Sequence, residues 1–143
     1  MDPADSPVII PSQLAAGFRS LGVATGQTLL LHASVKTVGW LLGGPRVILE
    51  AVLGIIAPGG TLMMLASWEG NPYRMERWPT AQRTACLAEC PGFDPASSPA
   101  DARELSILAE YLRTWPGAIA VSLHLPLRLL VIEVVAEPRI ART

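Results

Sequence analysis

A small polar segment follows the first strongly apolar run of the chain. The run 28–32 is apolar enough to be a buried strand, and Ser34, Lys36 and Thr37 come directly after it. A strand, a polar loop and then a helix is the arrangement with which α/β proteins present backbone N–H groups to an anion. The two hydroxyl groups and the ammonium group would add donors. The pattern therefore predicts an anion-binding loop, and the alternative is a solvated connection between a strand and a helix.

A second polar cluster follows the next apolar run, 61–66, which is typical of a strand buried on both faces. Trp68, Glu69, Asn71 and Tyr73 lie within the segment that leaves this run. Ligands of open α/β sheets bind at the carboxyl ends of strands. Aromatic rings with carboxylate and amide oxygens suit a polyhydroxylated, cationic ligand. The alternative is a surface loop whose rings fill a local pocket.

For the other ionisable residues, a purely structural role is an alternative to a role in catalysis or binding. Asp94 lies in a rigid Pro-Gly-Phe-Asp-Pro turn, where its carboxylate can bond to the local backbone. Glu110 lies beside the apolar stripe of a predicted helix, a place typical of a solvated face. His32 ends the first strand and is expected to be a buried structural histidine. Cys86 and Cys90 have no second Cys or His pair, so metal binding is not expected.

The elements that must position these residues follow from hydrophobic periodicity. We expect helices over 11–21, capped by Ser12, and over 45–56, where Pro45 suits a first turn. The strands at 28–32 and 61–66 then form a β–α–β unit with parallel neighbours. Two later helices are expected over 80–90, with Ala85 and Leu87 inward, and over 99–113, capped by Ser98. The second of these packs through Leu105, Leu108, Ala109 and Leu112. The fold class is therefore α/β, a layered β–α–β sheet with flanking helices.

The composition limits the classes of partner. The chain has 143 residues, of which 50% are hydrophobic and 16% charged, with a net charge of −1. One domain is expected at this length. No basic stripe is present, which argues against nucleic acid as a partner. The acidic N-terminus is no signal peptide, and no apolar run is long enough for a membrane span. These features predict a cytoplasmic protein.

Four separated blocks carry a resemblance to one family. They are His-Ala-Ser-Val-Lys-Thr-Val-Gly at 32–39, the Gly-Gly-Pro to Gly-Gly-Thr-Leu stretch at 43–62, Ser-Trp-Glu-Gly-Asn-Pro-Tyr at 67–73, and the span 93–117 from Phe-Asp-Pro to Glu-Tyr-Leu-Arg-Thr-Trp-Pro-Gly. Their order and spacing resemble the aminoglycoside 3-N-acetyltransferase family. The resemblance implies an antibiotic N-acetyltransferase fold in incomplete form and transfer of acetyl from acetyl-CoA to the 3-amino group of a deoxystreptamine aminoglycoside antibiotic.

The resemblance also implies site residues. In the family the first loop holds the pantetheine and pyrophosphate of the co-substrate, which corresponds here to Ser34, Val35, Lys36, Thr37 and Val38. The family's antibiotic pocket is acidic and aromatic. By that likeness Tyr73, Asp94 and Glu110 would face the ammonium groups of the aminoglycoside, with Glu69 as a further candidate. The amine would attack the thioester directly, with no covalent enzyme intermediate.

The likeness ends near residue 117. The family's later Asn-x-x-x-Leu-His-x-x-Glu block, which carries the histidine taken as general base, is absent, so no catalytic residue is assigned. Neither His32 nor His124 is chosen as a replacement. We therefore expect a disordered lead at 1–10, the N-terminal part of the family domain at 11–118 and a divergent tail at 119–143 that is truncated or out of frame. The alternative function is an inactive fragment that retains only CoA or aminoglycoside binding. The oligomeric state is left open.

Overall fold

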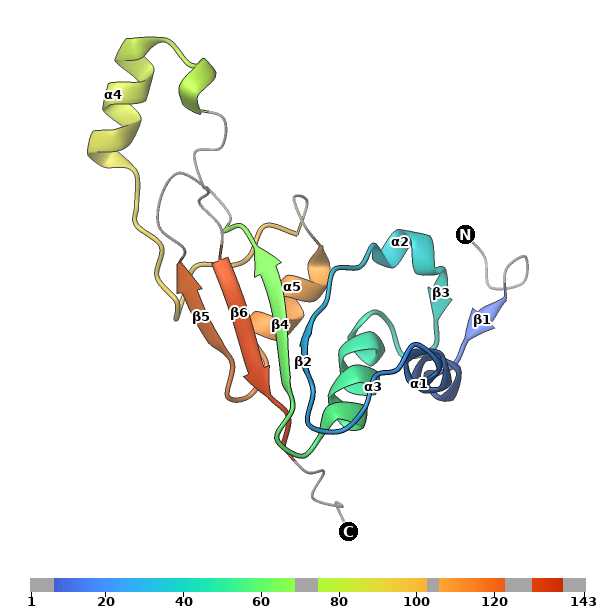
Figure 1. The fold of residues 1–143 in the computed structure, drawn as a ribbon. Coiled ribbons are helices and arrows are strands. Elements are labelled where there is room, and N and C mark those ends of the chain that lie inside the picture. Colours follow the sequence, from blue (N-terminus) through green and yellow to red (C-terminus); the bar gives the residue numbers. More distant parts are fainter. Residues whose placement is uncertain (1–6, 69–74, 103–105, 123–129, 138–143) are drawn as a thin grey trace.

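The computed structural model describes residues 7–68, 75–102, 106–122 and 130–137. Strands and helices alternate along the first half of the chain and are drawn in Figure 1. The strands are β1 (Val8–Ile9), β2 (Thr28–Leu30), β3 (Trp40–Leu41), β4 (Thr61–Ala66), β5 (Ile119–Ser122) and β6 (Leu130–Val135). The helices are α1 (Pro11–Ser20), α2 (Val35–Val38), α3 (Arg46–Ile56), α4 (Thr80–Glu89) and α5 (Ile107–Arg113), with a short 3₁₀ turn at Met75–Arg77.

The predicted β–α–β unit is present. β2 and β4 are parallel neighbours, with Leu30 opposite Met63, and α3 lies between them in the chain. The turn that leads from α3 into β4 is closely packed at Gly60. A Cβ there would lie 2.6 Å from the Ile56 carbonyl oxygen and 2.8 Å from that of Gln27. Glycine is therefore needed for the close approach of three backbone segments.

The core lies between one face of the main sheet and two helices. The sheet has the order β2-β4-β6-β5. The side chains of Leu62 and Met64 on β4 and of Ile132 on β6 are buried against α3 and α5. Full burial of such side chains contributes about 1.5–3 kcal/mol each. The largest fully buried residues of the two helices are Leu49, Val52, Ile56, Leu108 and Leu112.

The N-terminal segment differs from its prediction. Val8 and Ile9 form β1, which pairs in parallel with β3, so the expectation of disorder over 1–10 is wrong at these two residues. α1 begins at Pro11 with Ile10 as its N-cap, and Ser12 lies inside the helix. The Gln13 side chain accepts a hydrogen bond from the Ile10 N–H at 3.1 Å. The predicted serine cap is therefore not formed.

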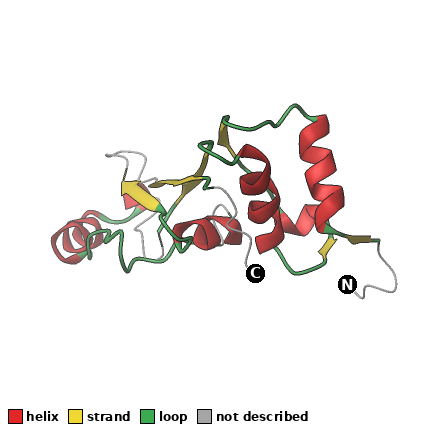
Figure 2. Cartoon of the chain, turned by 90° about the horizontal axis from the view of Figure 1, so that it is seen from below, coloured by secondary structure: helices red, strands yellow, loops and turns green. Residues whose placement is uncertain are grey.

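α4 lies apart from the rest of the molecule, at the opposite end from α1 in both views (Figure 1, Figure 2). None of its side chains is buried, and Leu87 is 64% exposed. The prediction that Ala85 and Leu87 face inward is therefore wrong, although the helix itself is present. The apolar spacing along α4 does not correspond to any packing surface within the described part of the chain.

The predicted helix over 99–113 is shorter than expected. α5 begins at Ile107, and the Ser106 hydroxyl accepts a hydrogen bond from the Leu108 N–H at 3.1 Å. Ser98 does not cap this helix, because its hydroxyl instead accepts from the Asp94 N–H at 2.9 Å. The predicted packing through Leu108, Ala109 and Leu112 is confirmed, since all three are buried. Leu105 lies outside the described residues.

The last segment belongs to the sheet. β5 and β6 pair with each other in antiparallel fashion, and β6 also pairs antiparallel with β4, from Thr61↔Val135 to Ala66↔Leu130. From the sequence, this segment is predicted only as a divergent tail. The structure instead places β6 between β4 and β5, where Ile132 and Val134 complete the core. The segment after residue 118 therefore supplies a central strand of the sheet.

Candidate functional site

The site is built at one edge of the main sheet, where β2 and β4 end. Because these strands are parallel neighbours, the segments that follow them leave the same edge. The hydrogen bond from the Leu31 N–H to the Met63 carbonyl, 2.9 Å, keeps the chain against β4 just before it turns into α2. The loop at 34–38 and the first residues of the second polar segment, Ser67 and Trp68, therefore leave the sheet at the same edge.

The candidate coenzyme loop, residues 34–38, folds as a single helical turn. The Thr37 and Val38 N–H groups donate to the Ser34 carbonyl at 3.1 and 3.3 Å. Val35 and Val38 pack against the core, while Ser34, Lys36 and Thr37 are exposed. The Thr37 hydroxyl donates to the Ser34 hydroxyl at 3.1 Å. The loop therefore presents two hydroxyl groups and one ammonium group to solvent on a turn anchored by two valines.

Gly39 ends this turn in a conformation that only glycine adopts easily. Its φ is +104°, in the region where an L side chain is strained. The chain can therefore leave α2 and enter β3 at once. The positive φ required at this point therefore explains why the 32–39 block ends in glycine.

His32 lies on the approach to this loop. It was expected to be a buried structural histidine, and the structure shows it exposed. The strand ends at Leu30, two residues before the predicted end, so His32 already lies in the connection to α2.

The end of β4 is held against the segment around residue 100. Trp68 forms an isolated antiparallel bridge with Ala100, and the Asp101 N–H donates to the Ser67 carbonyl at 2.7 Å. The Trp68 and Phe93 rings lie with centroids 5.4 Å apart, tilted by 42°. Segments 67–68 and 93–101 therefore meet at this edge, which the sequence alone did not predict.

The Asp94 carboxylate stabilises the turn that contains it. Its carboxylate accepts from the Ser97 hydroxyl at 2.6 Å and from the Ala96 N–H at 2.9 Å. These two hydrogen bonds hold the pKa of Asp94 below its ordinary value. The local backbone role that the sequence suggested is therefore present. The residue is also exposed, so the ionised carboxylate remains accessible from solvent.

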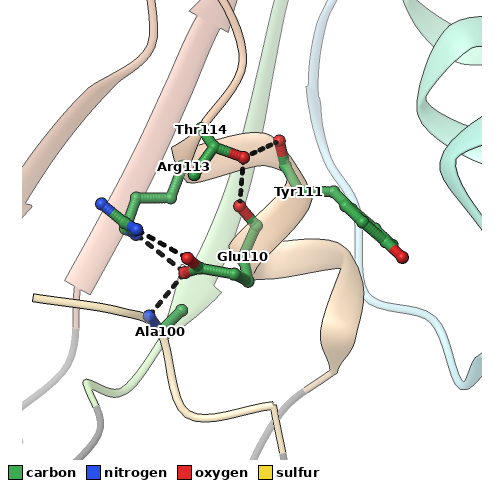
Figure 3. Close-up of polar contacts among 5 residues, drawn as sticks. All are labelled: Ala100, Glu110, Tyr111, Arg113 and Thr114. Atoms are coloured by element: carbon green, nitrogen blue, oxygen red, sulfur yellow. Dashed lines mark hydrogen bonds and ion pairs between the residues drawn. The ribbon is translucent and has the colours of Figure 1, made fainter.

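Both carboxylate oxygens of Glu110 accept hydrogen bonds from other groups of the protein (Figure 3). Its Oε1 accepts from Arg113 Nη2 at 2.6 Å, and its Oε2 accepts from Arg113 Nε at 2.7 Å and from the Ala100 N–H at 2.6 Å. The Arg113 hydrogen bonds, helped by the Ala100 N–H, lower the pKa of Glu110, and the same pair raises that of Arg113. Glu110 is partly buried, so the prediction of a solvated face residue is wrong.

Of the four predicted substrate residues, the structure describes Asp94 and Glu110. Glu69, Tyr73 and His124 lie outside the described residues. Asp94 and Glu110 accept hydrogen bonds from different groups, and Glu110 holds the segment at Ala100 that follows the Asp94 turn. Arg113 was not proposed as a site residue. Its spacing of three from Glu110 on a helix is the signal that could have identified the pair.

Neither a cluster of metal ligands nor a membrane-spanning helix is found among the described residues. No group of three or more His, Cys, Asp or Glu side chains in this part of the chain could hold a metal ion. No helix among these residues is both long enough and apolar enough to cross a membrane.

A β–α–β unit with an exposed polar turn after the carboxyl end of its first strand places the protein in the α/β class, in which that edge of the sheet is the usual place for a ligand. The sequence profile described as aminoglycoside 3-N-acetyltransferase matches residues 30–124. The chain belongs to that family.

Individual relatives agree with this assignment. The chain is 49% identical over 105 residues to aminoglycoside N(3)-acetyltransferase III of Pseudomonas aeruginosa, covering 73% of this chain and 38% of the relative. It is 37% identical over 108 residues to aminoglycoside N(3)-acetyltransferase VIII of Streptomyces fradiae, covering 75% and 37%. The chain thus spans less than two fifths of the length of these two relatives.

Solved structures match over more of this chain. The CoASH complex of AAC-IIIb is 36% identical with a TM-score of 0.66, covering 87% of this chain and 46% of that one. AAC-VIa bound to sisomicin is 29% identical with a TM-score of 0.72, covering 88% and 46%. The α/β fold class is confirmed, and the described fold corresponds to less than half of these structures.

Proposed function

We propose that this chain takes part in acetyl transfer from acetyl-CoA to the 3-amino group of a deoxystreptamine aminoglycoside. In that reaction the amine nitrogen bonds to the thioester carbonyl carbon, the carbon–sulfur bond breaks, and CoA leaves as the thiol. The observation that carries the proposal is the exposed loop 34–38 at the shared edge of β2 and β4, within the segment that matches the family. A solved relative with CoASH bound supports the choice of co-substrate.

The coenzyme side of the site rests on Ser34, Lys36 and Thr37. The two hydroxyl groups and the ammonium group are exposed and lie within one turn, where they can donate to phosphate oxygens. Val35 and Val38 anchor the turn in the core, and we propose that their backbone contacts the pantetheine part of the coenzyme. Lys36 is the one lysine of the chain, so the positive charge of this loop has a single source.

We propose that the aminoglycoside binds at carboxylates that lie after the end of β4 and in the 93–101 segment. Asp94 is ionised and exposed, and we propose that it faces an ammonium group of the aminoglycoside together with Glu69 and Tyr73. Several carboxylates that converge on a polycation add their separately small attractions. Glu110 supports this site less directly, because both its carboxylate oxygens already accept hydrogen bonds and it braces Ala100.

A second candidate function is binding without turnover. The chain spans 38% of the first relative, and the family's late histidine block is absent from the sequence. A general base typically contributes a factor of about 100 to 10,000 in rate. A chain that binds both substrates and lacks this base would hold CoA and antibiotic with little acetyl transfer.

The proposed function is tested by two measurements: acetyl transfer, and the protection of Lys36 from chemical labelling when CoA binds. Purified protein is mixed with acetyl-CoA and gentamicin at neutral pH, and release of the CoA thiol is followed. In parallel, an amine-reactive reagent labels Lys36, and mass spectrometry separates this label from that on the N-terminus. Acetyl transfer requires thiol release that depends on both substrates, and coenzyme binding requires slower labelling of Lys36 when CoA is present.

Matched variants make the result specific. Lys36→Ala should weaken CoA binding by about tenfold, as expected for loss of one hydrogen bond to a charged group. Arg19→Ala removes the same charge from the exposed last turn of α1 and should leave binding unchanged. Protection of Lys36 without thiol release would favour the binding-only alternative. Labelling that CoA does not slow would contradict the coenzyme site.

A further inference from the structure

One side of α4 carries both cysteines of the chain. Along Thr80–Glu89 and the C-cap Cys90, every side chain is exposed except those of Arg83, Cys86 and Cys90, which are partly covered. Residues three, four and seven apart lie on the same side of a helix. The two sulfurs therefore lie one above the other on consecutive turns, with the guanidinium in line with them. Both cysteines are free thiols.

The backbone of the last turn sets the spacing of these two thiols. The Cys90 N–H donates to the Cys86 carbonyl at 2.8 Å, which is the hydrogen bond of a regular α-helical turn. Side chains four apart in such a turn have Cβ atoms about 5–6 Å apart. A disulfide requires a Cβ separation of about 3.5–4.5 Å, so this pair is too widely spaced for one without movement of the backbone. An ion between the sulfurs fits better, because two metal–thiolate bonds of about 2.3 Å each span the gap.

The number and chemistry of the donors select the ion. Structural Zn²⁺ takes four ligands, and no three His, Cys, Asp or Glu side chains are grouped in the part of the chain that the structure describes. The adjoining carboxylate, Glu89, is exposed, and its oxygens suit harder ions. Thiolates are soft ligands that select Cu⁺, and two of them satisfy this ion in a linear arrangement. The missing second Cys or His pair therefore excludes a four-ligand site and leaves a two-ligand one.

We propose that Cys86 and Cys90 form a two-sulfur site for Cu⁺. Binding replaces two S–H bonds with two Cu–S bonds and releases two protons, and neither copper nor sulfur changes its oxidation state. The Cys90 thiol gives up its weak hydrogen bond to the Pro91 carbonyl, 3.6 Å, in exchange. None of the α4 side chains is buried, so the turn can adjust to the ion without disturbing packed side chains.

The charges around the site favour a bound cation. The last carbonyl groups of a helix carry partial negative charge, and the site lies at the C-terminal end of α4. The complex of Cu⁺ with two thiolates has one negative charge, which the guanidinium of Arg83 on the same side of the helix offsets. The helix stands away from the sheet (Figure 1), and the inference rests on α4 alone and not on the proposed acetyl transfer.

The experiment measures transfer of Cu⁺ to the protein from a coloured chelator. The reduced 143-residue chain is added, without oxygen, to Cu⁺ held by bicinchoninate, whose colour is lost as copper leaves it. We expect one Cu⁺ per chain and two sulfur neighbours around the ion in X-ray absorption. Cys86→Ser and Cys90→Ser should each lower the affinity at least tenfold. The circular dichroism of each variant should match that of the unsubstituted chain, because neither thiol is in the core.

Two double variants test the spacing and not merely the presence of two thiols. Gln82→Cys with Cys90→Ser moves the pair one turn earlier, to positions 82 and 86, and should bind Cu⁺ as the natural pair does. Ala85→Cys with Cys86→Ser leaves thiols at 85 and 90, on different sides of the helix, and should lower the affinity at least tenfold. Gln82 and Ala85 are both exposed, so the two substitutions are matched in their effect on packing.

Four results would overturn the proposal. One is copper that stays with bicinchoninate when the reduced chain is added. Another is unchanged affinity when Cys86 and Cys90 are both replaced by serine, which would place the ion at other groups. A ratio of one Cu⁺ to two chains would assign the two thiols to different copies. Equal affinity of the two double variants would show that spacing has no effect. None of these measurements uses acetyl-CoA or an antibiotic, so their outcome is independent of the proposed function.

Discussion

At the scale of single residues, the structure gives Glu110 a structural role that the sequence did not predict: it holds the segment around Ala100 in place. Two hydrogen bonds from Arg113 and one from the Ala100 N–H occupy both carboxylate oxygens. The bond to Ala100 joins α5 to the segment that bridges to Trp68. We therefore interpret Glu110 as the residue that positions the 93–101 segment at the end of β4.

This interpretation predicts a pH dependence. The folded state holds the pKa of Glu110 below its ordinary value of 4.5, so its contribution to stability is complete above that value and is lost as the pH falls through the lowered pKa. Glu110→Gln should lower the free energy of unfolding at pH 7 by about 1–3 kcal/mol and flatten its decline in acid. Urea unfolding between pH 7 and pH 3 measures both effects.

Glu50→Gln is the matched control for this prediction. Glu50 pairs with Arg46 at 3.5 Å, with both side chains more than 40% exposed, so its loss should cost less than about 1 kcal/mol. Equal losses for the two variants would contradict a bracing role for Glu110.

Two glycines should respond to alanine in opposite directions. Gly60→Ala would place a Cβ 2.6 Å from the Ile56 carbonyl oxygen and should destabilise the protein by more than about 1 kcal/mol. Gly54 lies in α3, and a Cβ added there would meet nothing within 4 Å, so Gly54→Ala should stabilise by about 0.5–1 kcal/mol. Thermal unfolding of both variants checks the signs, and a shift in the same direction would refute the close-approach argument.

At the scale of elements, β6 is the segment whose role differs most from what its sequence indicates. Its Ile132 is fully buried opposite Met64, while Val121 on the neighbouring edge strand is 50% exposed. Ile132→Ala should therefore cost about 2–5 kcal/mol, and Val121→Ala less than about 0.5 kcal/mol. Chemical denaturation measures the difference, and a small loss at Ile132 would mean that β6 does not occupy the centre of the sheet.

At the scale of the whole molecule, a net charge of −1 gives no general attraction for a polycation. Under the proposed function, attraction for an aminoglycoside comes from local carboxylates such as Asp94. Aminoglycoside binding should therefore weaken several-fold between about 50 and 300 mM NaCl, because salt screens exposed charges. Calorimetric titration at both concentrations checks this, and Asp94→Asn should reduce the salt dependence. An affinity that does not change with salt would argue against an acidic site.

Much of the local architecture could be predicted from the sequence. The run 61–66, the helix after Pro45 and the parallel pairing of their flanking strands follow from apolar periodicity and turn residues, and all are present. These features depend on neighbours within about thirty residues, where periodicity carries the information. The family assignment likewise depended on short blocks in a fixed order.

Predictions failed where a residue's environment comes from distant parts of the chain. Leu87 has helical apolar spacing, but α4 meets no surface in the described part of the chain, so that side chain stays in water. His32 ends an apolar run, but β2 ends at Leu30, and the side chain is exposed. Periodicity shows which side of an element is apolar and does not show whether another element covers it.

The sequence by itself determined the family, the β–α–β unit and the exposed polar turn at 34–38, because each depends on residues close together in the chain. Only the tertiary structure decided that Glu110 braces Ala100 and that β6 lies between β4 and β5. These features arise from pairings between segments far apart in sequence, such as Met64 with Ile132, and their energy depends on what packs against them.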